Sequence, residues 1–330
     1  ILFSFHIFSR KDIGGQANRY AEAIRAQGHY SESWFYERTL RNEPYDRLLN
    51  LNNDGFYGGR FRKLGYLKDA LLKFNIWHIH KGFSMFHKAN DLLLAKKLGK
   101  KIIIHYRGRE IRPEMGLDKL PDQIIEKVKR ENEIADLIFV KDGQLAELIA
   151  PYVARPIVFP NIVRIEHFIP PTDVPNDYYE TNRKLRIVHA PSNPRYKGTE
   201  YVRLAIKHLR DRIDYCELTG VSHKEVLHAY WGADIVIDQL LTGTYGNAAL
   251  ESMALGRCVV NFLNPTFTRY EPAIPPIVHT TIETLTEKLD LLDRSRDKIW
   301  SYGAKGKAFI KENHTSQSIG TKLIACYEGL

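Results

Sequence analysis

Short apolar runs rich in β-branched residues alternate with amphipathic stretches of helical period along the whole chain. Runs such as Lys101–Tyr106 and Ile235–Ile237 lack an alternating polar face, which is typical of strands that are buried on both sides of a parallel sheet. Parallel strands need crossover connections, and stretches of helical period lie between these runs. The pattern therefore predicts an α/β protein with parallel sheets covered by helices.

Two series of strands and helices follow one another. In the first series we expect strands at 1–8, 31–36, 76–80, 101–106, 137–140 and 157–159, and helices at 16–27, 86–98, 121–134 and 144–150. In the second series we expect strands at 185–189, 215–219, 235–237, 259–262 and 276–278, and helices at 199–210, 223–230, 248–255, 282–292 and 296–328. The section 168–183 is rich in proline and polar residues, which is typical of a linker. We predict two Rossmann-like domains, 1–167 and 184–310, with a ligand-binding cleft between them.

The composition is that of a soluble globular protein: 330 residues, 44% of them hydrophobic and 26% charged. No apolar run reaches the roughly 18 residues that cross a bilayer. The apolar N-terminus has no basic region before it and no cleavage site after it, so we expect a core strand rather than a signal peptide. The three cysteines stand far apart in apolar settings, which favours buried thiols over disulfides or metal ligands. We expect a cytoplasmic protein.

The formal charge of +9 indicates either a lysine-rich solvated surface or anionic partners. Residues 60–73 combine basic and apolar positions that fit a basic amphipathic helix. Peripheral association with the inner face of an anionic membrane is therefore one hypothesis. The basic residues are dispersed and we find no nucleic-acid-binding motif, so we expect no nucleic-acid partner.

The loop and helix at 243–256 have the strongest chemical signature in the sequence. Strand residues 235–238 precede them, and Gly246 permits a tight turn before a helix for which Asn247 is a candidate N-cap. A helix that begins from a glycine loop at the carboxyl end of a strand favours phosphate, because free N–H groups and the helix dipole point there. Glu251, one turn into the helix, is placed to accept hydrogen bonds from hydroxyl groups. A nucleotide sugar offers both a diphosphate and a ribose diol.

Two other loops leave the carboxyl ends of predicted strands. Gly14 and Gly15 follow the first strand and open the first helix, which lets the backbone approach a ligand closely. They do not form the dinucleotide fingerprint Gly-x-Gly-x-x-Gly, and this disfavours a nicotinamide-dependent dehydrogenase. In the loop after strand 185–189, Arg195 and Lys197 suit a diphosphate.

Histidines and arginines gather near two strands of the first series. His105 stands at the carboxyl end of its strand, where an α/β domain usually faces its ligand. The loop that follows is strongly cationic and contains Arg107, Arg109 and Arg112. His78 and His80 point to the same side of their strand, and we interpret them as half-buried strand residues. No carboxylate or cysteine stands beside them, so we expect no metal site.

Taken together, these residues resemble the GT-B glycosyltransferases, specifically the large retaining family (family 4-like, group 1) that uses nucleotide-sugar donors. Nearly the whole chain takes part in the resemblance. It is carried by Gly14-Gly15, 76–80, His105-Tyr-Arg-Gly108, 158–162, Lys197-Gly198, 218–234, 243–256 and 303–327. The resemblance implies the GT-B fold, an α/β architecture with two Rossmann-like domains whose parallel sheets face a central cleft. It also implies that a C-terminal helix, 311–330, crosses back to the N-terminal domain.

The resemblance further implies transfer of a sugar with retention of anomeric configuration, without a metal or another cofactor. As catalytic residues, Lys197 would hold the donor diphosphate, Glu251 the ribose hydroxyls, and His105 the donor sugar. The remaining nucleotide-sugar-binding residues would be Gly14, Gly15, Asn193, Arg195, Gly220, Val221, Gly246, Asn247 and Ala248. A glycan or lipid-linked acceptor would meet Arg107, Arg109, Arg112 and His80. A UDP-sugar donor and a role in bacterial-type surface polysaccharide synthesis are the favoured expectations.

Two positions depart from the pattern of that family. Gly243 stands where the family usually has a glutamate, eight positions before Glu251, and Pro191 stands where it tends to have an arginine, six positions before Lys197. Loss of the glutamate removes a contact to the donor sugar and leaves the donor open. Two alternatives remain: a nucleotide-sugar 2-epimerase of the same fold, and a non-catalytic protein that binds a nucleotide or a glycan.

Overall fold

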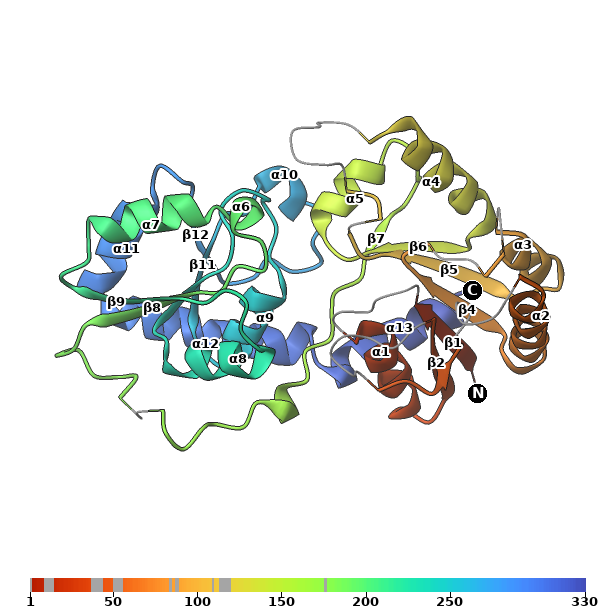
Figure 1. The fold of residues 1–330 in the computed structure, drawn as a ribbon, viewed down its shortest axis with the longest axis horizontal. Helices are drawn as coiled ribbons and strands as arrows, with labels where there is room; N and C mark the ends of the chain where they lie inside the picture. The colour runs from red at the N-terminus through yellow and green to blue at the C-terminus, as the bar shows by residue number, and fades with distance from the viewer. Residues whose placement is uncertain are drawn as a thin grey trace. The chain divides into compact units, whose positions relative to one another are not determined.

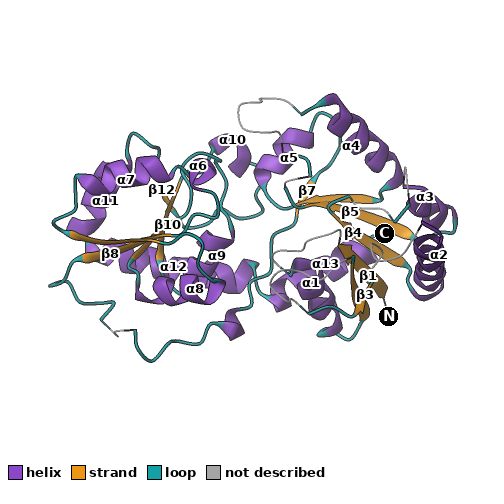
Figure 2. Cartoon of the chain, viewed as in Figure 1, coloured by secondary structure: helices purple, strands orange, loops and turns teal. Residues whose placement is uncertain are grey.

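The computed structural model (Figure 1) describes residues 2–8, 15–36, 44–49, 56–82, 85–86, 89–108, 110–112, 120–174 and 177–330. The chain forms two compact units, residues 1–162 with 316–330 and residues 163–315. Each unit has its own parallel sheet with helices packed against it (Figure 2). The predicted α/β fold with two parallel sheets is confirmed.

The first sheet has seven strands in the order β3-β2-β1-β4-β5-β6-β7, and every pairing among them is parallel. All five residues of β4 are buried, as expected for a strand that is covered on both faces. The strand order reverses between β1 and β4, and ligands of such sheets bind at the carboxyl ends of the strands at this point. The strands are β1 (Phe3–Phe8), β2 (Tyr30–Phe35), β3 (Arg47–Leu48), β4 (Ile76–His80), β5 (Lys101–Tyr106), β6 (Leu137–Val140) and β7 (Ile157–Val158).

Helices from both ends of the chain build the core of the first unit. Tyr20 and Ile24 of α1 pack with Ile319 and Leu323 of α13 in one apolar cluster. α13 begins after the second unit, so the end of the chain lies in the first unit. The helices of this unit are α1 (Gln16–Arg25), α2 (Phe56–Lys73), α3 (Asn90–Lys97), α4 (Asp122–Ile134), α5 (Gly143–Ile149) and α13 (Ser316–Glu328).

The second sheet has five parallel strands in the order β12-β11-β10-β8-β9, so its order reverses between β8 and β10. β9 is an edge strand and leaves Cys216 exposed, so the prediction of three buried cysteines is wrong at this position. The strands are β8 (Leu185–His189), β9 (Ile213–Glu217), β10 (Ile235–Ile237), β11 (Cys258–Asn261) and β12 (Val278–His279). The helices are η2 (Ile165–His167), α6 (Pro194–Lys197), α7 (Thr199–Lys207), α8 (His223–Gly232), α9 (Asn247–Ala254), α10 (Pro265–Thr268), α11 (Leu285–Arg294) and α12 (Arg296–Asn313).

The borders of the two units differ from the predicted domain borders. The second unit begins at Val163 and includes the described residues of the predicted linker, 168–174 and 177–183. Tyr178 Oη donates to the carbonyl oxygen of Gly256 at 3.2 Å, and the carboxylate of Asp177 accepts two hydrogen bonds from Arg186 at 2.7 Å. These polar contacts hold a segment whose composition alone is typical of a linker.

The single helix predicted at 296–328 is two helices. α12 ends at Asn313 and α13 begins at Ser316. The carbonyl oxygen of His314 accepts a hydrogen bond from the Val163 N–H at 2.8 Å. This carbonyl therefore bonds to a residue outside both helices. Among the described residues, no helix combines the length and the apolar character that crossing a membrane requires.

We expect two glycine-to-alanine substitutions in helices to have opposite effects on stability. A Cβ atom on Gly303 of α12 would lie 2.2 Å from the carbonyl oxygen of Gly256, a backbone atom with little freedom to move. Gly303→Ala should lower the free energy of unfolding by about 1–3 kcal/mol or more. A Cβ atom on Gly65 of α2 meets no atom within 4 Å, so Gly65→Ala should raise it by about 0.5–1 kcal/mol. Denaturant unfolding of both variants measures the difference, and a Gly303→Ala protein as stable as the parent would contradict the close packing.

Candidate functional site

The second unit brings three segments together at the point where its strand order reverses. Lys197 follows β8, Asp238 directly follows β10, and Gly246 precedes α9. Asp238 accepts hydrogen bonds from the Lys197 ammonium group and, at 2.9 Å, from the Gly246 N–H. The Asp238 side chain is fully buried, and the Lys197 side chain is 14% exposed. The carboxyl ends of strands at such a reversal are where α/β sheets bind their ligands.

The backbone around Lys197 is fixed by short-range contacts. Asn193 caps α6, because its side-chain oxygen accepts the N–H groups of Arg195 and Tyr196 at 3.1 and 3.3 Å. Gly198 ends this one-turn helix in the left-handed region at φ 74°, and the Lys197 carbonyl accepts from Leu240 N–H at 3.2 Å. The predicted ligand residue Asn193 thus has a structural role for its side-chain oxygen, while Arg195 is exposed.

A buried histidine joins the strands at the same place. His189, the last residue of β8, bonds through Nδ1 to the carbonyl oxygen of Ile237 and through Nε2 to Thr199 Oγ1, both at 2.9 Å. A carbonyl only accepts, so Nδ1 carries the proton and Thr199 donates to Nε2. Burial lowers the pKa of His189, which keeps this ring neutral. The ring therefore ties β8 to β10 and to the first residue of α7.

Glu251 lies one turn into α9 and is already hydrogen-bonded. Its Oε1 lies 2.9 Å from Nε2 of His223, the first residue of α8. Ser222 and Glu225 form a capping box that fixes the start of α8 and therefore the position of His223. Gly220, at φ 72°, and the exposed Val221 precede this helix in the loop after β9. The structure thus places Glu251 and the loop with the predicted nucleotide-sugar-binding residues Gly220 and Val221 on neighbouring elements, which His223 joins.

The start of α9 differs from the prediction in two respects. Gly246, not Asn247, is the N-cap residue, and Asn247 is already helical. The Gly246 N–H donates to Asp238, so this amide is not open to a phosphate as the structure stands. Asn247 and Ala248 occupy the first turn, where N–H groups have no acceptor within the helix. Asn247 and Ala248 therefore lie at a helix N-terminus, where the helix dipole attracts an anion.

Gly243 is a glycine for a steric reason. Its φ of 71° is left-handed, and a Cβ atom there would lie 2.7 Å from Cβ of Asn264 and 3.1 Å from the Phe267 ring. A glutamate therefore cannot occupy this position without moving α10. The neighbouring Thr244 carbonyl accepts from Asn261 Nδ2 at 2.9 Å, which holds the loop against β11. The local packing thus explains why position 243 is glycine and not the glutamate of the resembled family.

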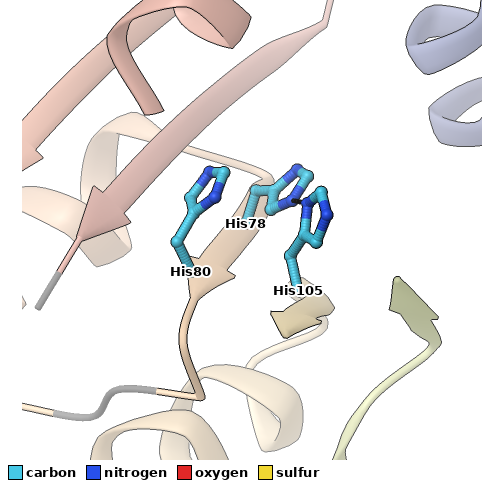
Figure 3. Close-up of side chains that lie close together, drawn as sticks. All are labelled: His78, His80 and His105. Atoms are coloured by element: carbon cyan, nitrogen blue, oxygen red, sulfur yellow. Dashed lines mark hydrogen bonds between the residues drawn. The ribbon is translucent and has the colours of Figure 1, made fainter. Parts of the chain in front are cut away.

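Three histidines form a buried cluster in the first unit (Figure 3). His78 and His80 lie on β4, and His105 lies on the neighbouring strand β5. Arg107 Nη1 donates to His105 Nε2 at 2.9 Å, His105 Nδ1 lies 3.1 Å from His78 Nε2, and His78 Nδ1 lies 2.7 Å from Tyr327 Oη. Because arginine only donates, His105 must carry its proton on Nδ1, and the same logic places the His78 proton on Nδ1. The result is a directed chain of hydrogen bonds from Arg107 to Tyr327.

One ring nitrogen from each of the three histidines lies within 4.8 Å of the other two, which is close enough to consider a metal ion. The rings of His78 and His80, however, stack with centroids 4.5 Å apart and planes within 6°. Lone pairs of stacked imidazoles lie in separate parallel planes and do not converge on one ion, and the cation of Arg107 stands beside His105. The arrangement is that of a hydrogen-bond relay. The expectation that no metal binds stays a prediction.

The remaining predicted residues of the first unit have varied positions. His80 and His105 are fully buried, so neither ring is open to a sugar as the structure stands. Arg107 is partly buried over the Tyr20 ring, with 5.3 Å from Cζ to the ring centroid. Gly15 is the N-cap of α1 at φ 61°. Gly14 and Arg109 lie outside the described residues.

Arg112 is engaged by a buried carboxylate. Its Nη2 lies 2.6 Å from Asp142 Oδ2, and its Nε donates to Gln144 Oε1 at 2.9 Å. Burial opposes the charge of Asp142, but Arg112 and Lys141 outweigh it, so the pKa of this carboxyl lies below its ordinary value. Arg112 and Lys141 therefore present a partly neutralised cationic group at the carboxyl ends of β5 and β6.

Comparison with known proteins identifies the fold. No protein-family model matches the sequence, and no curated protein matches it. The structure of Anabaena HepE in complex with UDP is similar with a TM-score of 0.69 at 11% identity, covering 100% of both chains. Sucrose-phosphate synthase from Thermosynechococcus elongatus has a TM-score of 0.68 at 12% identity, covering 99% of this chain and 98% of that chain. UDP-GlcNAc 2-epimerase from Neisseria meningitidis, bound to UDP-GlcNAc, has a TM-score of 0.59 at 11% identity, covering 99% and 100%. The chain has the GT-B fold.

Proposed function

We propose that the protein is a glycosyltransferase that takes a sugar from a nucleotide-sugar donor and transfers it, with retention of configuration, to a glycan or lipid-linked acceptor. One observation carries the proposal. At the strand-order reversal of the second sheet, Lys197, the first turn of α9 and Glu251 lie on adjoining elements. A cation, a helix N-terminus and a carboxylate suit the diphosphate and the ribose diol of one nucleotide.

The same groups suit the chemistry of transfer. The bond between the sugar and the diphosphate breaks, and negative charge develops on the leaving diphosphate. Asp238 neutralises part of the Lys197 charge, so we assign the remaining stabilisation to Arg195 and to the N–H groups of Asn247 and Ala248. Since these groups supply positive charge, the proposed reaction needs no metal ion.

We favour UDP as the nucleotide. HepE, which has the same fold, has been solved with UDP and with UDP-glucose. In the proposal, Gly220 and Val221 line the base, because they form the loop between β9 and the helix that positions Glu251. The acceptor would meet the cationic edge of the first unit at Arg107 and Arg112. The function we favour within the cell is synthesis of a surface polysaccharide or glycolipid.

A nucleotide-sugar 2-epimerase is the second candidate function, because epimerase structures share this fold. They are less similar, with a TM-score of 0.59 for the Neisseria enzyme against 0.69 for HepE. An epimerase also needs acid and base groups at the sugar. Neither Glu251, paired with His223, nor Asp238, paired with Lys197, is arranged as a free base in the described site.

The test is a binding and turnover panel. UDP, GDP and ADP are each added to the protein, and the melting temperature is followed; a ligand at 100 times its dissociation constant stabilises by about 2.7 kcal/mol. UDP-glucose and UDP-GlcNAc are then incubated with and without glycan acceptors, and released UDP and the anomeric form of the product are read by NMR. UDP release with retained configuration supports the proposal. A 2-epimer formed from UDP-GlcNAc alone, binding without turnover, or no nucleotide binding would each overturn it.

A further inference from the structure

Helix α2 of the first unit has two apolar faces, and one of them is exposed. Leu67 and Ala70 of α2 are buried, as is Phe74 directly after the helix. Phe61, Leu64 and Leu72 are 74%, 53% and 77% exposed. Positions 61, 64, 68 and 72 follow one stripe of a helix with 3.6 residues per turn. A surface helix normally has a single apolar stripe, so the second one requires an explanation.

The exposed stripe continues onto α3. Leu98, directly after α3, is 57% exposed and lines a groove of about 490 Å³ together with Leu64 and Leu72. The segment that directly follows α3 lies beside α2 in the first unit, and Figure 2 shows where both helices lie. We call this face, Phe61, Leu64, Lys68, Leu72, Leu98 and Lys100, the α2–α3 face.

The charges on and beside the α2–α3 face are positive. The charged residues that line the groove are Lys68 and Lys100. Arg62 and Lys97 are exposed nearby. The acidic residue of α2, Asp69, pairs with Arg47 at 2.7 Å, so a cation offsets its charge. Leucines between cations are what a helix needs to lie in the headgroup region of an anionic bilayer.

We propose that the α2–α3 face docks the protein onto an anionic membrane surface. The leucines and Phe61 enter the boundary between headgroups and acyl chains, and the lysines contact anionic headgroups. A second copy of the chain is a poor occupant, because a self-complementary contact would bring the same lysines together. The proposal rests on this face alone and does not depend on the nucleotide site of the second unit.

Vesicle co-sedimentation tests the proposal. The protein is mixed with phosphatidylcholine vesicles that contain or lack phosphatidylglycerol. We expect binding to the anionic vesicles, weakened by salt because lysine–headgroup attraction is screened. Leu72→Glu should weaken it about tenfold or more, since an apolar side chain leaves the bilayer and a negative charge approaches it. Lys68→Glu should act in the same direction.

Leu204→Glu is the matched control. Leu204 is an exposed leucine of α7 in the second unit, 58% exposed, and its substitution should leave vesicle binding unchanged. Circular dichroism and the melting temperature establish that the variants fold like the parent. Binding by Leu72→Glu equal to that of the parent would overturn the proposal. So would a parent protein that ignores anionic vesicles, or a parent dimer that Leu72→Glu converts to monomer.

Discussion

Removing either charge of the Lys197–Asp238 pair is expected to lower the free energy of unfolding by about 3–5 kcal/mol. Asp238 is fully buried and Lys197 nearly so, so each single substitution leaves one charge without its partner where water hardly reaches. Lys197→Met leaves the carboxylate with a hydrogen bond from the neutral Gly246 N–H but without its cation. Asp238→Asn turns an amide NH2 toward either the ammonium or the Gly246 N–H, and both of these groups only donate.

The double variant Lys197→Met/Asp238→Asn should lose less than the sum of the two single losses, because it leaves no buried charge. Urea unfolding followed by circular dichroism measures the free energy of unfolding of the parent, the two single variants and the double variant. Arg203→Met is the control. It breaks the exposed pair with Glu217 in the same unit and should leave stability nearly unchanged. Strictly additive losses at Lys197 and Asp238 would mean that the two charges are not coupled.

The central strands of both sheets were predictable because burial on both faces produces continuous apolar runs. β4, β5, β6, β8 and β10 have the bounds that the sequence predicts. Other interior strands, such as β11, differ from the prediction by one or two residues, and a missed strand and a two-residue shift at both ends occur at the sheet edges. β3 has only two residues and was missed, and the edge strand β9 spans 213–217 where 215–219 was predicted. An edge strand has one neighbour and a mixed burial pattern, so its periodicity carries less information.

One-turn helices were also missed, for a different reason. α6 and α10 each have four residues, and each begins at a capping asparagine followed by proline. Apolar periodicity needs several turns to become visible, so these elements could have been found only from the Asn-Pro pairs at Asn193 and Asn264. This matters for function, because α6 sets the position of Lys197.

Some residues of the site could be predicted because glycines mark the segments that contain them. Others could not, because their contacts form only between segments that the fold brings together. Lys197 and Glu251 lie on helices that glycines mark in the sequence, Gly198 directly after Lys197 and Gly246 at the start of α9. Asp238 is not among the predicted site residues, although an acidic residue directly after a buried strand is a signal of a site. Its partner Lys197 lies 41 residues away, and the pairing becomes visible only once β8 and β10 are known to be neighbours. His223 was missed in the same way, because its contact with Glu251 spans 28 residues.

Glu251→Ala should remove most of the stabilisation that UDP provides. A carboxylate that accepts hydrogen bonds from ligand hydroxyls contributes about 1.5–3 kcal/mol for each bond, so its loss weakens binding by about 10- to 100-fold or more. At a UDP concentration 100 times the parent dissociation constant, the stabilisation would fall from about 2.7 to about 0.4 kcal/mol if binding weakens 100-fold. Thermal unfolding with and without UDP measures this change.

The ribose assignment can be separated from a general loss of the site. His223→Ala keeps the carboxylate but removes the group 2.9 Å from its Oε1, so it should weaken UDP binding less than Glu251→Ala does. A UDP analogue without the ribose hydroxyls offers Glu251 nothing to accept, and it should bind the parent and Glu251→Ala equally. If Glu251→Ala weakens UDP and this analogue by the same factor, Glu251 acts through the position of α9 and not through the ribose. That outcome would leave the diphosphate part of the site, with Lys197 and the first turn of α9, as the part that recognises the nucleotide.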